Sequence, residues 1–504
     1  MASTRIQLNL GAPHVEVPSR LFGTFVEHMG RCVYEGIFEP GHPSADADGF
    51  RGDVLELVRE LGATVVRYPG GNFVSGYAWE DGIGPVDDRP VRLDAAWHSV
   101  ETNRVGLDEF AAWAERAGLA VMEAVNLGTR GPAEAAQLLE YANHPSGTAL
   151  GDLRRRNGRE QPWGIGLWCL GNEMDGPWQI GHKTADEYGR LAAETARLMK
   201  FIDPTIELVV AGSSNMDMPT FGEWERTVLA HTAGLVDHIS VHAYYEEVDG
   251  DVRSFLASAV GLDRYLDVVA GIIDEVRADA GLEKQIGISV DEWNVWYQSR
   301  WNDTVKDDVM SGEWSVAPRL IEDEYSVTDA VVVGSLLISL LRHSDRVTMA
   351  NLAQLVNVIA PIRCEPGGAA WRQTTFFPFQ LTASRARGQV VVPTISSYGI
   401  PTEKYGLVDA VDAVATVDAE GTVTVFVVNR DTESAVDLEL DLADGELALR
   451  EALTLTVPPG GDRFSTNTAS GQPVTPVALA TEGSTVTLPA LSWSVLTLGR
   501  NGTS

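Results

Sequence analysis

Two glutamates close apolar runs that have the character of buried strands. One run reads Gly166-Leu-Trp-Cys-Leu-Gly-Asn-Glu173, and the other reads Ile286-Gly-Ile-Ser-Val-Asp-Glu292. Cleavage of a glycosidic bond needs such a pair, because one acid protonates the leaving oxygen while one carboxylate meets the positive charge that develops at the anomeric carbon. A separation of ~5–5.5 Å between the two groups would give double displacement with retention. The pair therefore predicts a glycoside hydrolase if both runs end at one place in the fold.

A single glutamate after a strand is most often a solvated loop acid. Here each of the two acids has a tryptophan and an asparagine nearby in the sequence, which favours the catalytic interpretation. Other apolar runs also end in polar side chains, which buried sugar hydroxyls would need as partners: Glu27, Arg67 with Asn72, Asn126, Ser213, His242 with Tyr244, and Gln354. A core histidine with satisfied hydrogen bonds is an equally good reading of His242, and Asn126 and Ser213 could serve only the backbone.

Tryptophans offer a second kind of contact to a sugar. Trp79, Trp97, Trp178 and Trp296 could form apolar platforms for sugar faces, although each could equally belong to ordinary packing.

The elements that would position these residues follow a regular alternation. From about residue 20 to 385, short β-rich runs alternate with amphipathic stretches such as 52–61 and 185–201. This pattern is typical of parallel strands joined by helices. The runs lie at 21–27, 64–68, 119–126, 166–173, 207–213, 238–244, 285–292 and 347–354. Eight of them predict a closed α/β barrel of the (β/α)8 or TIM type, whose active site lies where the strands end.

The remainder of the chain has a different pattern. Alternating segments separated by Asp, Gly and Pro occur at 413–417, 422–428, 436–440, 447–456, 485–488 and 494–498, and they predict a C-terminal β-sandwich of jelly-roll character. The alternating strand at residues 5–10 has no parallel neighbour in the barrel, so we expect it to join the sandwich. The predicted division is 1–18 for this N-terminal segment, 19–385 for the catalytic barrel and 386–504 for the sandwich.

Composition excludes several classes of protein. The formal net charge is −33, and no basic run gathers phosphate-binding charge, so nucleic acid and anionic membranes are not expected partners. Three widely spaced cysteines support neither a disulfide framework nor a zinc site. The longest apolar run, 330–341, is too short for a membrane span and instead predicts a buried helix capped by Ser326 and Asp329. No continuous apolar stretch follows Met1, so we expect a cytoplasmic protein.

Five blocks of the sequence carry a resemblance that runs nearly end to end. They read Gly23-Thr-Phe-Val-Glu-His28, Arg67-Tyr-Pro-Gly-Gly-Asn-Phe-Val-Ser-Gly-Tyr77, Trp168-Cys-Leu-Gly-Asn-Glu-Met-Asp-Gly176, Asp291-Glu-Trp-Asn-Val-Trp-Tyr297 and Asn351-Leu-Ala-Gln-Leu-Val-Asn357. In them the chain resembles the intracellular α-L-arabinofuranosidases of glycoside hydrolase family 51.

The resemblance implies an exo-acting, retaining hydrolase that releases terminal α-L-arabinofuranosyl residues from arabinan, arabinoxylan or arabino-oligosaccharides. It makes Glu173 the acid/base and Glu292 the nucleophile, with no metal and no organic cofactor. It also implies a homo-oligomer, most often a hexamer. The residues expected around the bound sugar are Glu27, Arg67, Asn72, Trp97, Asn172, Tyr244, Trp296 and Gln354.

Other functions remain open from the residues alone. The same barrel and acids could act on another furanoside, such as a galactofuranoside, or on a β-glucan. A sugar-binding protein without turnover is disfavoured because both acids are present. A metal-dependent barrel hydrolase would lose its activity on exhaustive chelation.

Overall fold

A closed barrel of parallel strands forms the larger part of the molecule. In the computed structural model, which describes residues 2–11, 15–442, 447–479, 481–482 and 485–500, these strands run around the barrel in chain order. They are β3 (Gly23–Phe25), β4 (Val65–Tyr68), β7 (Ala120–Val125), β8 (Leu167–Leu170), β9 (Glu207–Val210), β10 (His238–Tyr245), β11 (Gly287–Val295) and β12 (Val347–Leu352). The predicted (β/α)8 barrel is confirmed, and each strand overlaps its predicted run.

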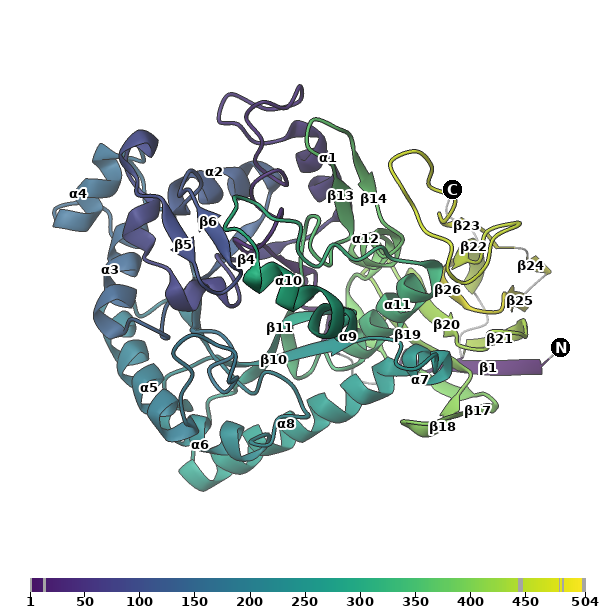
Figure 1. Ribbon diagram of the computed structural model, residues 1–504. Helices are drawn as coiled ribbons and strands as arrows, with labels where there is room; N and C mark the ends of the chain where they lie inside the picture. The colour runs from purple at the N-terminus through teal and green to yellow at the C-terminus, as the bar shows by residue number, and fades with distance from the viewer. Residues whose placement is uncertain (1, 12–14, 443–446, 480, 483–484, 501–504) are drawn as a thin grey trace.

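Helices cover the outside of the barrel (Figure 1). They are α1 (Gly52–Leu61), α2 (Leu107–Ala117), α3 (Pro132–Asn143), α5 (Ala185–Ile202), α6 (Glu223–Thr232), α8 (Ser258–Ala280), α11 (Val327–Arg342) and α12 (Phe376–Arg385). Each turns its apolar side to the strands; in α1 the buried residues are Val54, Leu55, Leu57, Val58 and Leu61, at the spacing of one helix face. The barrel interior is filled by side chains such as Met122, Cys169 and Met349.

Two facing sheets form the C-terminal part of the fold. The smaller has the strand order β16-β1-β21-β25-β24, and the larger has the order β2-β15-β19-β20-β26-β22-β23. The main strands are β19 (Val411–Val417), β20 (Val423–Asn429), β21 (Val436–Leu442), β22 (Leu447–Thr456), β25 (Thr485–Leu488) and β26 (Ser492–Arg500). Alternate residues of both sheets, among them Val425, Val427, Leu438 and Val486, meet in a common core, which confirms the β-sandwich.

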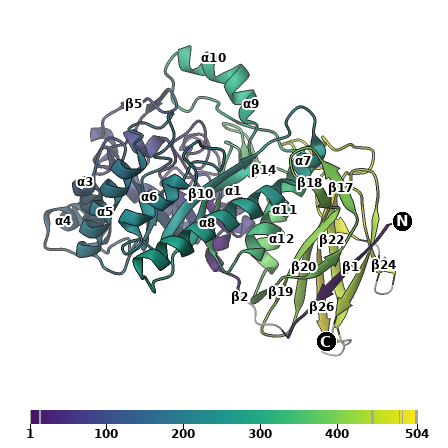
Figure 2. The ribbon, with the colours of Figure 1, turned by 90° about the horizontal axis from the view of Figure 1, so that it is seen from below.

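The N-terminal strand β1 (Ala2–Leu8) lies inside this sandwich (Figures 1 and 2). It pairs in parallel with β21 and antiparallel with β16 (Thr394–Ser396), and Ile6 and Leu8 are completely buried. The short β2 (Val15–Glu16) pairs with β15 (Gln389–Val391) in the other sheet. Residue 1, residues 12–14 and residues 501–504 of the predicted segments lie outside the described residues.

Helix α11 joins the two parts of the molecule. Ser326 caps it, accepting from the Asp329 backbone N–H at 3.4 Å and donating to the Asp329 carboxylate at 2.8 Å, as predicted. Residues 327–341 are all buried, because one side of the helix faces the barrel and the other faces the sandwich. Gly334 lies against the indole of Trp493 on β26, so close that a Cβ would come within 2.3 Å of it. Among the described residues, no helix combines the length and apolar character that a membrane crossing requires.

Short elements surround the mouth of the barrel, where the strands end. The hairpin of β5 (Arg92–Asp94) and β6 (Ser99–Glu101) follows β4, and α7 (Val252–Leu256) follows β10. Helices α9 (Gln298–Arg300) and α10 (Lys306–Ser311), joined by a π-helical turn, follow β11. The sandwich contributes the hairpin of β17 (Gly399–Thr402) and β18 (Gly406–Asp409), which lies beside α7 in both views (Figures 1 and 2).

Candidate active site

The two glutamates lie across the same barrel mouth. Glu173 follows β8, and its backbone has a φ of 43°, in the left-handed region that non-glycine residues seldom adopt. Glu292 lies within β11, which continues three residues past the predicted end to Val295. The register between β10 and β11 shifts before His242 and Glu292, and such an irregularity redirects side chains. One carboxylate oxygen of each glutamate lies within 4.8 Å of the other, well short of the ~6.5–9.5 Å of inverting enzymes.

Glu292 is held as a carboxylate. Its two oxygens accept hydrogen bonds from Arg67 Nη1 at 2.9 Å and from the Tyr244 hydroxyl at 2.8 Å. Burial acts to raise the pKa of Glu292, but the charges of His242 and Arg67 and these hydrogen bonds bring the pKa below its ordinary value. A buried, ionised carboxylate that is already oriented is suited to nucleophilic attack.

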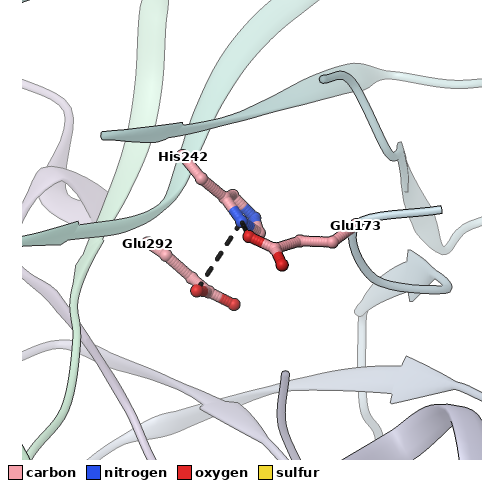
Figure 3. Close-up of side chains that lie close together, drawn as sticks. All are labelled: Glu173, His242 and Glu292. Atoms are coloured by element: carbon pink, nitrogen blue, oxygen red, sulfur yellow. Dashed lines mark hydrogen bonds and ion pairs between the residues drawn. The ribbon is translucent and has the colours of Figure 1, made fainter. Parts of the chain in front are cut away.

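His242 lies between the two acids (Figure 3). Its Nδ1 is 2.9 Å from Glu173 and 3.6 Å from Glu292. Burial alone would lower the pKa of His242, but the two carboxylates raise it, which favours the imidazolium form. The three side chains are the group among the described residues with the spacing of metal ligands. Because His242 contacts both carboxylates, it is placed to balance the charge of the site when a proton moves to or from Glu173.

Asn172 and Arg67 are hydrogen-bonded to each other beside Glu292. Asn172 Oδ1 accepts from Arg67 Nη2 at 2.7 Å, which turns the amide nitrogen of Asn172 the other way. That nitrogen is buried and has no hydrogen-bond partner among the described residues. A buried donor without a partner costs free energy, about 1–3 kcal/mol, which a sugar hydroxyl could recover.

A buried carboxyl group forms the closed end of the site. Glu27 follows β3, and one of its oxygens accepts from the Phe73 N–H at 2.9 Å and from Trp97 Nε1 at 2.8 Å. Burial raises the pKa of Glu27 to about 8 despite these hydrogen bonds. Gly70 has a φ of +143°, and a Cβ on it would come within 2.5 Å of Glu27. The glycine is needed because the backbone passes directly over the carboxyl group.

The remaining predicted residues lie around the same opening. Gln354 donates to Glu27 at 3.2 Å, and Trp296 packs edge-on against Tyr244 with ring centroids 5.0 Å apart. Trp296 Nε1 is buried and without a partner among the described residues. Asn72 is half-buried, and its side chain does not cap the helical turn that follows it. The structure thus joins by contacts the residues expected around the sugar, except that Asn72 is placed only through its neighbour Phe73, whose N–H binds Glu27.

Three other residues that the sequence singled out contact loops and core of the protein. Asn126 binds the backbone of its own loop, accepting from the N–H groups of Gly128 and Thr129 at 3.0 Å each. Ser213 donates its N–H to Glu225 at 2.8 Å, and its buried hydroxyl has no hydrogen-bond partner among the described residues. Trp79 packs against Tyr141 in the core.

Trp178 contacts one of the two acids, which the sequence did not indicate. Its indole N–H donates to Glu173 at 2.7 Å, and 47% of the residue is exposed. Gly176 permits this approach, because a Cβ there would come within 2.6 Å of the indole. Asp291 is a further buried neighbour of this site, 3.8 Å from Arg67; it directly precedes Glu292, but the sequence did not single it out.

Comparisons with known proteins agree along the whole chain. The family model described as "Alpha-L-arabinofuranosidase 1 domain" matches residues 57–259, and the one described as "Alpha-L-arabinofuranosidase C-terminal domain" matches residues 291–492. The chain is 56% identical to the intracellular exo-α-(1→5)-L-arabinofuranosidase of Streptomyces lividans, over 98% of this chain and 75% of the relative. It is 55% identical to the exo-α-(1→6)-L-arabinofuranosidase of Bifidobacterium longum, over 95% and 94%.

A third relative and a solved structure complete the comparison. The intracellular exo-α-(1→5)-L-arabinofuranosidase 1 of Bacillus subtilis is 50% identical, over 96% of both chains. The crystal structure of a family 51 α-L-arabinofuranosidase from Bifidobacterium longum superposes with a TM-score of 0.94 at 48% identity, covering 99% of this chain and 100% of that one.

Proposed function

The chain belongs to the α-L-arabinofuranosidases of glycoside hydrolase family 51, and from this membership we propose that Glu292 is its nucleophile and Glu173 its general acid/base. The protein is a retaining exo-α-L-arabinofuranosidase, which releases terminal arabinofuranosyl groups. The observation that carries the two roles is the different environment of the acids. Arg67 and Tyr244 bind Glu292 as an anion, whereas Glu173 contacts a histidine and an indole at the open side of the site.

In the first step, Glu292 attacks the anomeric carbon while Glu173 gives its proton to the leaving oxygen. The bond from the anomeric carbon to that oxygen breaks, and an ester bond to Glu292 forms. Arg67 and Tyr244 keep the attacking carboxylate ionised and fixed in direction. His242 contacts both acids, so it can compensate the change in charge as the proton leaves Glu173.

In the second step, Glu173 acts as a base. It takes a proton from water, whose oxygen attacks the anomeric carbon, and Glu292 leaves as a carboxylate. Two displacements at one carbon restore the original configuration. This path is supported by the closest oxygens of the two carboxyl groups, which lie within 4.8 Å of each other, whereas inverting enzymes keep a wider gap for a water molecule.

The polar residues of the closed end are proposed to bind the hydroxyls of the arabinofuranosyl group. The free amide N–H of Asn172 points to a contact with the hydroxyl next to the anomeric carbon, where hydrogen bonds strengthen at the transition state. Glu27, Asn72 and Gln354 would bind the remaining hydroxyls. Trp97 and Trp296 would limit the width of the pocket.

We propose arabino-oligosaccharides as the natural substrates. The names of the relatives specify α-(1→5) or α-(1→6) bonds, and several contain the word intracellular, which supports a cytoplasmic enzyme acting on imported fragments. A homo-oligomer, most simply a hexamer, and the division at residues 18 and 385 are further proposals. The galactofuranoside and β-glucan alternatives are not favoured, because the relatives are named as arabinofuranosidases.

The two roles predict different defects for the two alanine variants. Glu292→Ala should abolish turnover of every arabinofuranoside, since no covalent intermediate can form. Glu173→Ala should still react with nitrophenyl α-L-arabinofuranoside, because nitrophenolate leaves with little acid help, and the intermediate should then accumulate. The measurement is a rapid-mixing time course with and without sodium azide. We expect a burst of nitrophenolate, and faster turnover in azide that yields the glycosyl azide of retained configuration.

Glu16→Ala, at an exposed position on β2, is the matched control and should behave as wild type. Absence of azide rescue in Glu173→Ala, or an azide product of inverted configuration, would show that the roles are wrong.

A further inference from the structure

A large cavity lies beside the catalytic residues at the barrel mouth. Its volume is about 820 Å³, within the ~300–1,000 Å³ of typical ligand sites. Tyr244 and Trp296 form its inner wall, and the same two residues line the sugar site. Its outer wall is the tip of the β17–β18 hairpin, residues 403–405, so the barrel and the sandwich build it together.

The cavity adjoins the sugar site at the barrel mouth. Arg67 lies on β4, and Glu27 and Gln354 follow β3 and β12; these three strands are consecutive around the barrel. The cavity is lined by residues at or after the ends of β9, β10 and β11, and β11 pairs directly with β12. Tyr244 and Trp296 border both the sugar site and the cavity, so a leaving group that extends past Trp296 enters the cavity.

The walls of the cavity have the chemistry that binds sugars. Tyr245 and Tyr405 supply aromatic rings, on which the apolar faces of sugars pack. Tyr245 lines the cavity, and burial together with nearby phenol and acidic groups raises the pKa of its hydroxyl, so the hydroxyl remains a neutral donor. Asp217 and Gln298 add oxygen acceptors for sugar hydroxyls.

The charge of the lining selects among sugars. Its acidic residues outnumber its basic residues, Arg253 and Lys404; the acidic ones are Asp217, Glu246, Asp249, Asp251 and Glu403. The chain as a whole carries a formal charge of −33. An anionic oligosaccharide would be repelled by this surface, whereas a neutral one would not.

A second cavity extends the first along the sandwich. It has a volume of about 210 Å³ and shares Arg253 with the larger cavity. Tyr398 and residues 399–401 and 430–434 line it. Because the two cavities share Arg253, they are neighbours, and together they offer room for more than one sugar unit.

We infer that this pair of cavities binds the leaving-group part of a neutral oligosaccharide, with the β17–β18 hairpin as its outer wall. The inference rests on the proposed arabinofuranosidase function and extends it to substrates longer than a disaccharide. The sandwich then takes part in substrate selection rather than only in stability.

The test compares kcat/KM on nitrophenyl α-L-arabinofuranoside with kcat/KM on linear α-(1→5)-linked arabino-oligosaccharides of two to five units. Wild type should gain about tenfold in kcat/KM between the disaccharide and the longer chains, mainly through KM. Tyr405→Ala should lose about that factor on the longer chains and change less than twofold on the nitrophenyl substrate. Oxidation of the reducing end to a carboxylate should raise the KM of a long substrate, because it places an anion among the acidic residues of the cavity.

Two further variants separate binding from folding. Tyr405 also packs against Gly261 of α8, so Tyr245→Phe, which removes a single hydroxyl, provides a second test with an expected loss of about threefold on the longer chains only. Leu407 lies on the same hairpin, is 76% exposed and is outside both cavity linings. Leu407→Ala should therefore leave kcat/KM unchanged on every substrate. The inference would be overturned if kcat/KM of the wild type did not depend on chain length, or if both tyrosine variants lost kcat/KM equally on all substrates. No cleavage of the nitrophenyl substrate by wild type would instead contradict the proposed function.

Discussion

At the scale of single residues, Glu27 shows how burial raises the pKa of a carboxyl group and so favours its neutral form. The pKa of Glu27 is about 8 in the fold, above the ordinary ~4.3 of an unfolded glutamate. A group with a raised pKa stabilises the folded state below its unfolded pKa, and this contribution is lost as the pH rises through the folded pKa. The thermal midpoint of the wild type should therefore fall between about pH 4.5 and pH 8 more steeply than that of Glu27→Gln. The expected difference across this window is roughly 3 °C or more.

Differential scanning calorimetry at several pH values checks this prediction. The exposed Glu420→Gln is the matched control, and its pH profile should coincide with that of the wild type. Parallel profiles for wild type and Glu27→Gln would mean that Glu27 is ionised in the folded protein at neutral pH.

The sequence could predict where the two proposed catalytic acids lie, because both are attached to strands. A carboxyl group after a buried strand can only lie at the barrel mouth, so Glu173 and Glu292 were within reach of pattern analysis. His242 remained ambiguous, because a histidine in a buried strand has the same sequence pattern whether it contacts an acid of the active site or a carbonyl group of the core. Trp178 could not be placed, because its contact with Glu173 depends on a loop that folds back on itself.

At the scale of elements, α11 joins barrel and sandwich through a position that admits only glycine. A methyl group at Gly334 would come within 2.3 Å of Trp493, whose indole is fully buried. Gly334→Ala should therefore force the helix and the sheet apart and destabilise the protein by about 1–3 kcal/mol, as overpacking does. Thermal unfolding followed by circular dichroism measures this effect.

The matched change lies on α8. Gly271 is exposed in the helix interior, and a Cβ there would meet nothing within 4 Å. Gly271→Ala should stabilise the protein by about 0.5–1 kcal/mol, because alanine has the higher helix propensity. Shifts of the same sign in both variants would argue against steric contact at Gly334 as the cause.

Pattern analysis recovered the elements that have a regular period and missed those that do not. The strands of the barrel and the long strands of the sandwich alternate or form apolar runs, and they were predicted within a few residues. The β17–β18 hairpin was missed because its strands are mostly exposed and have no apolar face. Its position beside α7 depends on how the two parts of the molecule dock, which no local pattern records.

At the scale of the whole molecule, the fold depends on its first strand. Ile6 is completely buried in the sandwich core, whereas Arg5 beside it has a side chain that is 63% exposed. Ile6→Ala should cost about 2–5 kcal/mol, and deletion of residues 1–12 should cost more, because β21 and β16 would each lose their neighbour. Arg5→Ala should leave the thermal midpoint unchanged. Equal midpoints for Arg5→Ala and Ile6→Ala would contradict a structural role for this strand.

The pairing of β1 with β21 also sets the order of events during synthesis. The two strands are about 430 residues apart in the chain, with the whole barrel between them. At ~5–20 residues per second, a ribosome that has made β1 needs roughly 20 to 90 s to make its partner. During this interval the barrel strands are released in order and can close, while Ile6 and Leu8 remain without their sheet. In the nascent chain, the apolar side of β1 therefore stays without its sheet until β21 has been made.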